Sequence, residues 1–106
     1  MSQAPEKVYA DDEVAAKLAE LGLSEWTLEG GWIRRKYNTD GWPQTLMAVN
    51  AIGYLAESAD HHPDMLVKWG SVAVSLSTHS AGGITDKDFA LARRIQDLVG
   101  GAISEC

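Results

Sequence analysis

The chain has 106 residues, of which 45% are hydrophobic and 23% are charged, a balance typical of one compact domain and not of a disordered or fibrous chain. Nine Lys and Arg against fifteen Asp and Glu give a net charge of −6, which excludes a general electrostatic attraction to nucleic acid. A core of this size gives modest stability, so self-association would stabilise the fold.

The sequence lacks the features of a membrane, secreted or disulfide-bonded protein. Its apolar runs are a few residues long, far short of the roughly 20 that span a bilayer, and the N-terminal MSQAPEK has no basic-then-apolar signal pattern. The single cysteine, Cys106, excludes an internal disulfide and a CxxC zinc or redox site. We therefore expect one cytoplasmic domain over residues 1–106, with no membrane and no nucleic-acid partner.

The first third of the chain predicts a helix followed by a hairpin. Asp11 and Asp12 are suited to cap a helix whose apolar residues recur at helical spacing as far as Gly22, where such helices commonly stop. Residues 26–37 then predict two short strands joined by a pair of glycines. The basic run 34–36 is interpreted as a solvated strand face, because the chain as a whole is acidic.

A long central helix is predicted over residues 42–59, where apolar side chains again recur at helical spacing. Pro43 is compatible with it because a proline is tolerated in the first turn. Pro63 limits the helix at its far end, because the residue before a proline is disfavoured in the helical conformation. His61 and His62 therefore lie at the helix end or in the turn after it.

Residues 65–79 predict two strands, with Gly70 and Ser71 as the turn or bulge between them. From residue 72 onward apolar residues alternate with small polar ones, so one face of the second strand is apolar and the other is polar. This alternation assigns His79 to the polar face at the strand end.

The last element is a helix that opens at residues 85–88, TDKD, which have the form of a capping box. Leu91, Ile95 and Leu98 follow at helical spacing. The predicted fold is therefore α+β, with the order α-β-β-α-β-β-α and three helices packed on one face of a four-stranded antiparallel sheet.

All three histidines lie within nineteen residues, and one predicted hairpin separates the pair His61 and His62 from His79. The end of the second strand can return to the turn after the helix, so three imidazoles are expected to converge on one cleft. Imidazole exchanges protons near neutral pH, with an ordinary pKa near 6.5. Asn50, Glu57 and His61 share one helical stripe, so a carboxylate is available to orient a histidine.

Two other interpretations of these residues stay open. Histidines at a helix C-terminus also favour the helix dipole without any further role. The histidines with Asp60 and Glu57 also offer donors for zinc, although the usual i, i+4 pair of histidine ligands is absent. Motifs for a covalent nucleophile, a phosphate-binding loop or a dinucleotide fold are absent from the sequence, so proton transfer is the chemistry it favours.

The region around the histidines resembles the pterin-4a-carbinolamine dehydratases, also called 4a-hydroxytetrahydrobiopterin dehydratases. The family pattern places an acidic residue before His-His-Pro and follows it with an aromatic residue, a histidine and an aspartate at set spacings. Every position is matched, by Glu57, His61, His62, Pro63, Trp69, His79 and Asp88. These positions span about a third of the chain, and the order of helices and strands extends the likeness to nearly all of it.

This resemblance implies a reaction and a set of site residues. The reaction is the dehydration of a 4a-hydroxytetrahydropterin to a quinonoid dihydropterin, which recycles the pterin cofactor of aromatic amino acid hydroxylases. The substrate is itself a pterin cofactor, so no other cofactor and no metal are expected. The resemblance implies catalytic roles for His61, His62, His79 and Glu57, the last orienting the histidines, and pterin contacts for Asp60, Ser77, Thr78, Ser80 and Trp69.

Two of the matched residues also have structural explanations. Trp69 is as well suited to packing as to stacking on a pterin. Asp88 stands three residues after Thr85, which makes capping of the last helix the preferred explanation.

The resemblance also implies partners and an alternative function. Family members form homodimers or homotetramers through sheet edges or helices, and an aromatic amino acid hydroxylase is a possible partner. The alternative is a non-enzymatic interaction or assembly protein on the same fold, either a transcriptional coactivator or an assembly factor for the carbon-fixing enzyme. The complete set of Glu57, His61, His62 and His79 favours the enzyme.

Overall fold

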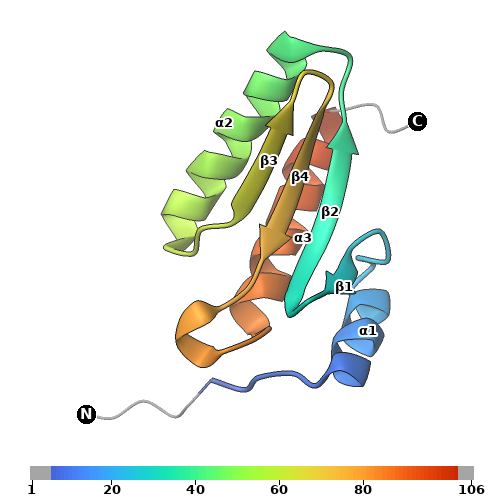
Figure 1. Cartoon of the computed structure of the whole chain (residues 1–106), viewed down its shortest axis with the longest axis vertical. Helices are drawn as coiled ribbons and strands as arrows, with labels where there is room; N and C mark the ends of the chain where they lie inside the picture. Colours follow the sequence, from blue (N-terminus) through green and yellow to red (C-terminus); the bar gives the residue numbers. More distant parts are fainter. Residues whose placement is uncertain (1–5, 103–106) are drawn as a thin grey trace.

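The structure is a computed structural model that describes residues 6–102, so Cys106 lies outside the described residues. The elements follow the predicted order, α-β-β-α-β-β-α, with one short 3₁₀ helix inserted before the last helix (Figure 1). They are α1 (Asp11–Glu20), β1 (Thr27–Glu29), β2 (Trp32–Asn38), α2 (Trp42–Ala59), β3 (Asp64–Lys68), β4 (Ser71–Leu76), the 3₁₀ helix η1 (His79–Ala81) and α3 (Asp86–Ala102).

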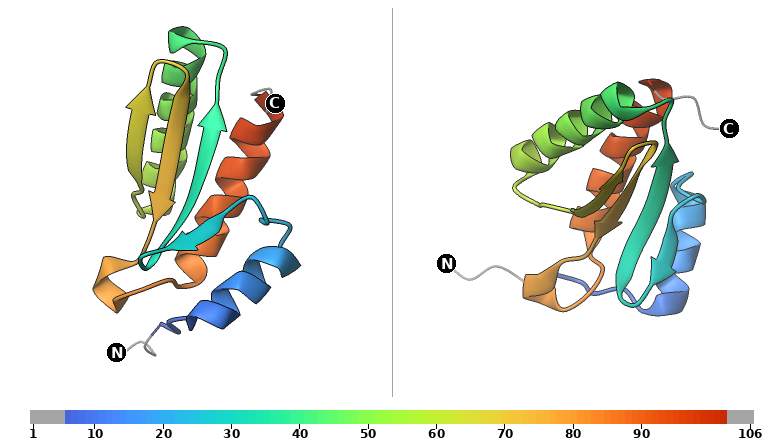
Figure 2. Two further views of the ribbon diagram at one scale, coloured as in Figure 1. Left: turned by 45° about the vertical axis from the view of Figure 1, so that its right-hand side comes forward. Right: turned by 45° about the horizontal axis from the view of Figure 1, so that its top comes forward.

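The four strands form one antiparallel sheet in the order β1-β2-β4-β3, so β3 and β1 are its edges. Helices α2 and α3 lie against one face of this sheet, and α1 lies beside β1 (Figures 1 and 2). Within residues 6–102, no helix covers the opposite face of the sheet (Figure 2). The predicted α+β class and four-stranded antiparallel sheet are confirmed.

The core lies between the sheet and the helices because strand alternation and helical spacing turn their apolar residues to the same side. On β4 the predicted alternation is confirmed, since Val72, Val74 and Leu76 are fully buried. All three helices contribute buried residues to the same core, among them Val14, Leu18, Ile52, Leu91, Ile95 and Val99. Within residues 6–102, no helix is both long and apolar enough to cross a membrane.

The start of α1 differs from the prediction that Asp11 and Asp12 cap it. The N-cap residue is Ala10, and both aspartates lie inside the first turn, where they face the positive end of the helix dipole. The carboxylate of Glu13 instead accepts a hydrogen bond from the Ala10 backbone N–H at 2.9 Å. This hydrogen bond, together with that from Lys7, lowers the pKa of Glu13 below its ordinary value.

Tyr37 places a buried hydroxyl in the core with no hydrogen-bond partner among residues 6–102. Its ring packs edge-on against Trp26 and lies 4.5 Å from the Arg35 guanidinium carbon. Burial raises the pKa of Tyr37 to about 12, whereas an ordinary tyrosine titrates near 10. Between these two values the unfolded chain has lost the Tyr37 proton and the folded chain has not, so the free energy of unfolding falls as the pH rises above about 10.

Tyr37→Phe is therefore expected to leave the free energy of unfolding at pH 7 unchanged or to raise it by up to about 1 kcal/mol, because it removes an unpaired buried hydroxyl and keeps the ring. The variant is also expected to lose less stability than the wild type between pH 9 and about 11. Urea denaturation followed by circular dichroism measures both effects. A loss of more than about 1 kcal/mol at pH 7 would show that the hydroxyl is hydrogen-bonded.

Candidate active site

Helix α2 ends in a left-handed turn at Asp60, and this turn directs both adjacent histidines out of the helix. Asp60 has φ 51° and ψ 42° and is the one non-glycine residue with a positive φ in the described part of the chain. Aspartate tolerates this conformation better than most residues. The His61 backbone N–H closes the turn by donating to the carbonyl of Ala56 at 3.1 Å. The predicted position of the histidines, at the helix end or just after it, is confirmed.

The left-handed turn changes which histidine lies beside Glu57. Helical spacing places Glu57 and His61 on one stripe, but the helix ends before His61, and it is His62 that returns to the Glu57 carboxylate. The distance from His62 Nε2 to Glu57 Oε1 is 2.8 Å. The two side chains are 57% and 81% exposed, so solvent weakens this pair. Glu57 thus pairs with His62, and the expected stripe with His61 is not formed.

His61 instead pairs with Asp88 in the interior of the protein. The distance from His61 Nε2 to Asp88 Oδ1 is 2.6 Å, and the side chains are 11% and 0% exposed. Because a carboxylate oxygen accepts, His61 Nε2 carries the hydrogen, and Nδ1 is then the ring nitrogen available to exchange a proton. The pair holds the imidazole in one orientation and one tautomer.

The second oxygen of Asp88 joins His61 to the segment that carries His79. Asp88 Oδ2 accepts a hydrogen bond from the Thr78 hydroxyl at 2.8 Å and one from the Thr85 backbone N–H at 2.9 Å. The second bond is the predicted helix cap, which is confirmed. The same carboxylate therefore caps α3 and links His61, just after the end of α2, with Thr78, the residue that precedes His79.

His79 begins the short helix η1 and is not part of β4, which ends at Leu76. The prediction that it lies on the polar face of the strand is wrong, because the chain leaves the sheet and turns back, with the Gly82 and Gly83 N–H groups bonding to the carbonyl of Thr78. The exposed His79 ring packs edge-on against Trp32, with ring centroids 5.0 Å apart. Trp32 was not predicted as a site residue, since no spacing pattern connects the start of β2 with His79.

The remaining residues expected to contact the pterin fall into two groups. Ser77 and Thr78 are buried in the segment that follows β4, whereas Asp60 and Ser80 are exposed beside the histidines of their segments. These four residues belong to the two segments that Asp88 links. The assignment of each to pterin binding stays a prediction.

Trp69 lies apart from this group, in the turn between β3 and β4. Its indole packs against Gly41, the N-cap of α2, and the hydroxyl of Thr45 donates to its carbonyl at 2.9 Å. Because an 18-residue helix rises about 27 Å, the N-terminus of α2 is far from the histidines at its C-terminal end. The structure therefore gives Trp69 a packing contact and does not bring it to the histidines, although its indole is 70% exposed.

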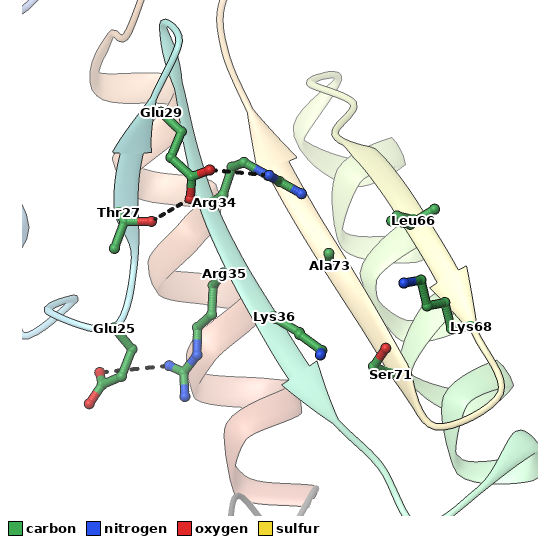
Figure 3. A pocket seen from close by; sticks show the side chains of 10 residues that line it. All are labelled: Glu25, Thr27, Glu29, Arg34, Arg35, Lys36, Leu66, Lys68, Ser71 and Ala73. Atoms are coloured by element: carbon green, nitrogen blue, oxygen red, sulfur yellow. Dashed lines mark hydrogen bonds and ion pairs between the residues drawn. The ribbon is translucent and has the colours of Figure 1, made fainter.

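The uncovered face of the sheet carries polar hollows separate from the predicted residues. The one drawn in Figure 3 has a volume of about 330 Å³ and is lined by basic and acidic side chains of β1, β2 and β3, and none of the predicted site residues lines it. Within residues 6–102, no three His, Cys, Asp or Glu side chains are grouped to hold a metal ion. The hydrogen-bonded group of His61, Asp88 and Thr78 is the arrangement suited to proton transfer.

Comparison with known sequences identifies the family. The family described as Pterin 4 alpha carbinolamine dehydratase matches residues 7–98. A protein of Mycobacteroides abscessus named "Putative pterin-4-alpha-carbinolamine dehydratase" is 49% identical over 93 residues, which cover 88% of this chain and 97% of that protein. A protein of the same name from Roseiflexus castenholzii is 40% identical and covers 84% of this chain and 94% of its own length.

Solved structures agree with this result. A crystal structure titled as a transcriptional coactivator/pterin dehydratase from Brucella melitensis superposes with a TM-score of 0.79 at 26% identity, over 89% of this chain and all of that one. A pterin dehydratase-like protein described as a RuBisCO assembly factor in the alpha-carboxysome has a TM-score of 0.58 at 20% identity, which shows a shared fold only. From the sequence match over residues 7–98 and the matching fold, the chain belongs to the pterin 4 alpha carbinolamine dehydratase family.

Proposed function

We propose that this chain catalyses the removal of water from a 4a-hydroxytetrahydropterin to give a quinonoid dihydropterin. The observation that carries the proposal is the Asp88 carboxylate, which links the segment of His61 and His62 to the segment of His79. Membership of the family supports the choice of substrate. The three imidazoles, facing one substrate, would supply the proton transfers.

The reaction needs two proton transfers and no further reagent. The bond from C4a to the hydroxyl oxygen breaks, and that oxygen leaves as water after it receives a proton. N5 of the ring loses a proton, and its electron pair forms the new double bond between N5 and C4a. One general acid and one general base therefore suffice, each contributing about 10²- to 10⁴-fold in rate. The pterin is the substrate, so the proposal requires no additional cofactor or metal.

Within this proposal His61 is the residue suited to accept the N5 proton. Asp88 fixes the tautomer in which Nδ1 is the acceptor, and its negative charge stabilises the imidazolium that forms. His79 and His62 are exposed and free to approach the 4a hydroxyl group. In a cell with an aromatic amino acid hydroxylase, the reaction returns the spent pterin to the cycle.

A stopped-flow experiment tests the function. Mixing the chain with a freshly generated 4a-hydroxytetrahydropterin is expected to accelerate the loss of its ultraviolet absorbance beyond the buffer rate, and the catalysed part is expected to vary with pH between about 6 and 8, where imidazoles titrate. Loss of absorbance at the buffer rate across that range would refute the proposed activity. A catalysed rate independent of pH would argue against histidines as the acid and the base.

We also propose that the chain forms a two-fold dimer through the edge strand β3. This strand pairs with β4 on one side only, and Leu66 is 54% exposed on it. Antiparallel pairing of two copies centred on Leu66 would place Asp64 of each opposite Lys68 of the other, with Met65 opposite Val67. Neither Asp64 nor Lys68 forms an ion pair with the residues at positions 6–102, so both charges are available for this contact.

A charge exchange tests the dimer. Asp64→Lys and Lys68→Asp, each alone, are expected to shift the wild-type dimer toward monomer, because like charges would then face each other. The double variant restores opposite charges and is expected to recover the dimer. Sedimentation equilibrium measures the mass in each case. A monomeric wild type, or single variants as dimeric as the wild type, would contradict this interface.

A further inference from the structure

The hollow drawn in Figure 3 carries a positive charge on an acidic protein. It lies on the uncovered face of the sheet, and the four basic and two acidic side chains among its walls give it a net charge of +2, whereas the whole chain carries −6. These side chains are Arg34, Arg35, Lys36, Lys68, Glu25 and Glu29. Its volume of about 330 Å³ lies at the lower end of the range for sites of small molecules. The hollow therefore suits a small anionic ligand.

Two lysines of this hollow have no polar partner in the described part of the chain. Among residues 6–102, six of the nine Lys and Arg form ion pairs with carboxylates, and Arg94 donates to a serine hydroxyl instead. Lys36 and Lys68 form neither an ion pair nor a side-chain hydrogen bond with those residues. The two arginines of the hollow each pair with one of its two glutamates. The positive charge left for a ligand is therefore that of the two lysines.

Strand pairing brings a hydroxyl group between these two lysines. Lys68 on β3 pairs in register with Ser71 on β4, and Lys36 on β2 pairs with Ala73, which is two positions from Ser71 and on the same face. Figure 3 shows both lysine side chains reaching toward β4, where the Ser71 hydroxyl lies between them. Ser71 is 7% exposed, yet its hydroxyl forms no hydrogen bond with the residues at positions 6–102. Three hydrogen-bond donors without partners therefore face one point of the hollow.

We propose that Lys36, Ser71 and Lys68 bind the phosphate group of a small phosphomonoester, a ligand distinct from the pterin. A phosphate group of this kind carries about −1.5 to −2 charges at pH 7 and has three acceptor oxygens. Two ammonium groups and a hydroxyl match it both in charge and in hydrogen bonding, whereas a carboxylate would neutralise one lysine only. The carbon part of the ligand would lie over Ala73 and Leu66, the neighbouring pair on β4 and β3 that also lines the hollow.

This site is separate from the candidate active site. Asp64 begins β3 directly after Pro63 and the histidine pair, and Lys68 ends the strand, which places the two ends about 13 Å apart. In the proposed dimer Lys68 also lies opposite Asp64 of a second copy. Ion pairs between exposed side chains are weak, and Lys36 and Ser71 lie on the inner strands β2 and β4, away from that edge. The ligand therefore keeps these two contacts in the dimer.

The test is a titration of the full chain, in buffer free of phosphate, with glycerol 3-phosphate and separately with inorganic phosphate. Amide nitrogen–proton NMR spectra are expected to show saturable shifts at Lys36, Ser71 and Lys68, with the lower Kd for glycerol 3-phosphate. Lys36→Met keeps an unbranched side chain at an exposed position and is expected to raise that Kd about tenfold, the effect of one hydrogen bond from a charged donor. Ser71→Ala, on another strand, is expected to raise it about fivefold.

Arg94→Met is the matched control, because it removes the same charge from α3, outside the hollow, and is expected to keep the wild-type Kd. Shifts that do not saturate, or an Arg94→Met variant that weakens binding as much as Lys36→Met, would show attraction to the net charge alone and overturn the site. Equal Kd values for the two probes would assign the site to inorganic phosphate and overturn the phosphomonoester. The dehydratase proposal stands whatever the result, because no histidine takes part in this site.

Discussion

Replacement of His79 by alanine is expected to lower kcat for the dehydration of a 4a-hydroxytetrahydropterin by about 10²- to 10⁴-fold, the contribution of one positioned proton donor or acceptor. The fold should be retained, because the ring is exposed and its one ring contact within residues 6–102 is the edge of Trp32. Stopped-flow rates measure the activity, and thermal unfolding measures the stability.

Two further variants test whether the loss of activity in His79→Ala comes from the missing proton transfer or from the smaller side chain. His79→Gln keeps a polar side chain of similar size and is expected to be as inactive as His79→Ala. Lys87→Ala changes an exposed residue of α3 that contacts neither histidine segment and is expected to keep the wild-type rate. A His79→Ala variant with wild-type kcat would show that His79 is neither the general acid nor the general base.

Replacement of Asp88 is expected to lower both stability and activity, because its carboxylate caps α3 and also holds the His61 ring. Asp88→Ala leaves the Thr85 backbone N–H, the Thr78 hydroxyl and the His61 ring without their acceptor. Leaving a buried donor without its acceptor costs about 1–3 kcal/mol, and this variant removes an acceptor from three donors, so it is expected to be strongly destabilised. Urea denaturation measures that loss.

Asp88→Asn isolates the effect on catalysis. The amide oxygen can still accept one hydrogen bond, so the helix start is partly kept, but the negative charge that orients His61 is lost. We expect kcat to fall by up to about 10²-fold, with a smaller change in KM. Asp86→Asn is the matched control in the same helix turn, since Asp86 bonds to Tyr9 and to neither histidine segment. An Asp88→Asn variant with unchanged kcat would show that Asp88 caps α3 and has no role in catalysis.

The elements that the sequence predicts well are those specified by neighbouring residues. Apolar spacing and the two prolines predict helix 42–59, which is α2 as observed. Alternation along residues 72–76 and the capping pattern at residues 85–88 are likewise local signals, and both are confirmed. Each of these features depends on contacts within a few positions of the chain.

The site depends on contacts that local patterns do not encode. The extrapolated helical stripe pairs Glu57 with His61, but a single left-handed residue, Asp60, ends the helix first and gives Glu57 to His62. His61 and Asp88 are 27 positions apart and meet only when α3 packs beside the end of α2. The capping pattern predicts the hydrogen bond that one oxygen of Asp88 accepts from the Thr85 backbone N–H. The contact of the other oxygen with His61 depends on how α3 packs, so local sequence does not predict it.

The contact of Trp32 with His79 is likewise not predicted by any local sequence pattern. It joins the start of β2 to a 3₁₀ turn that the alternation of β4 did not predict. Trp69 shows the opposite case. It matches the family pattern in the sequence, but in the fold it packs against the N-terminus of α2, at the other end of that helix from the histidines.

Imidazole resonances test the central claim most directly, since the claim is that three rings face one substrate. Long-range proton–nitrogen spectra of the wild-type chain, assigned with single His→Gln variants, are titrated with a stable 7,8-dihydropterin. We expect the resonances of His61, His62 and His79 to shift together with a single Kd. Rings that do not respond to the pterin, or that respond with different Kd values, would contradict the account.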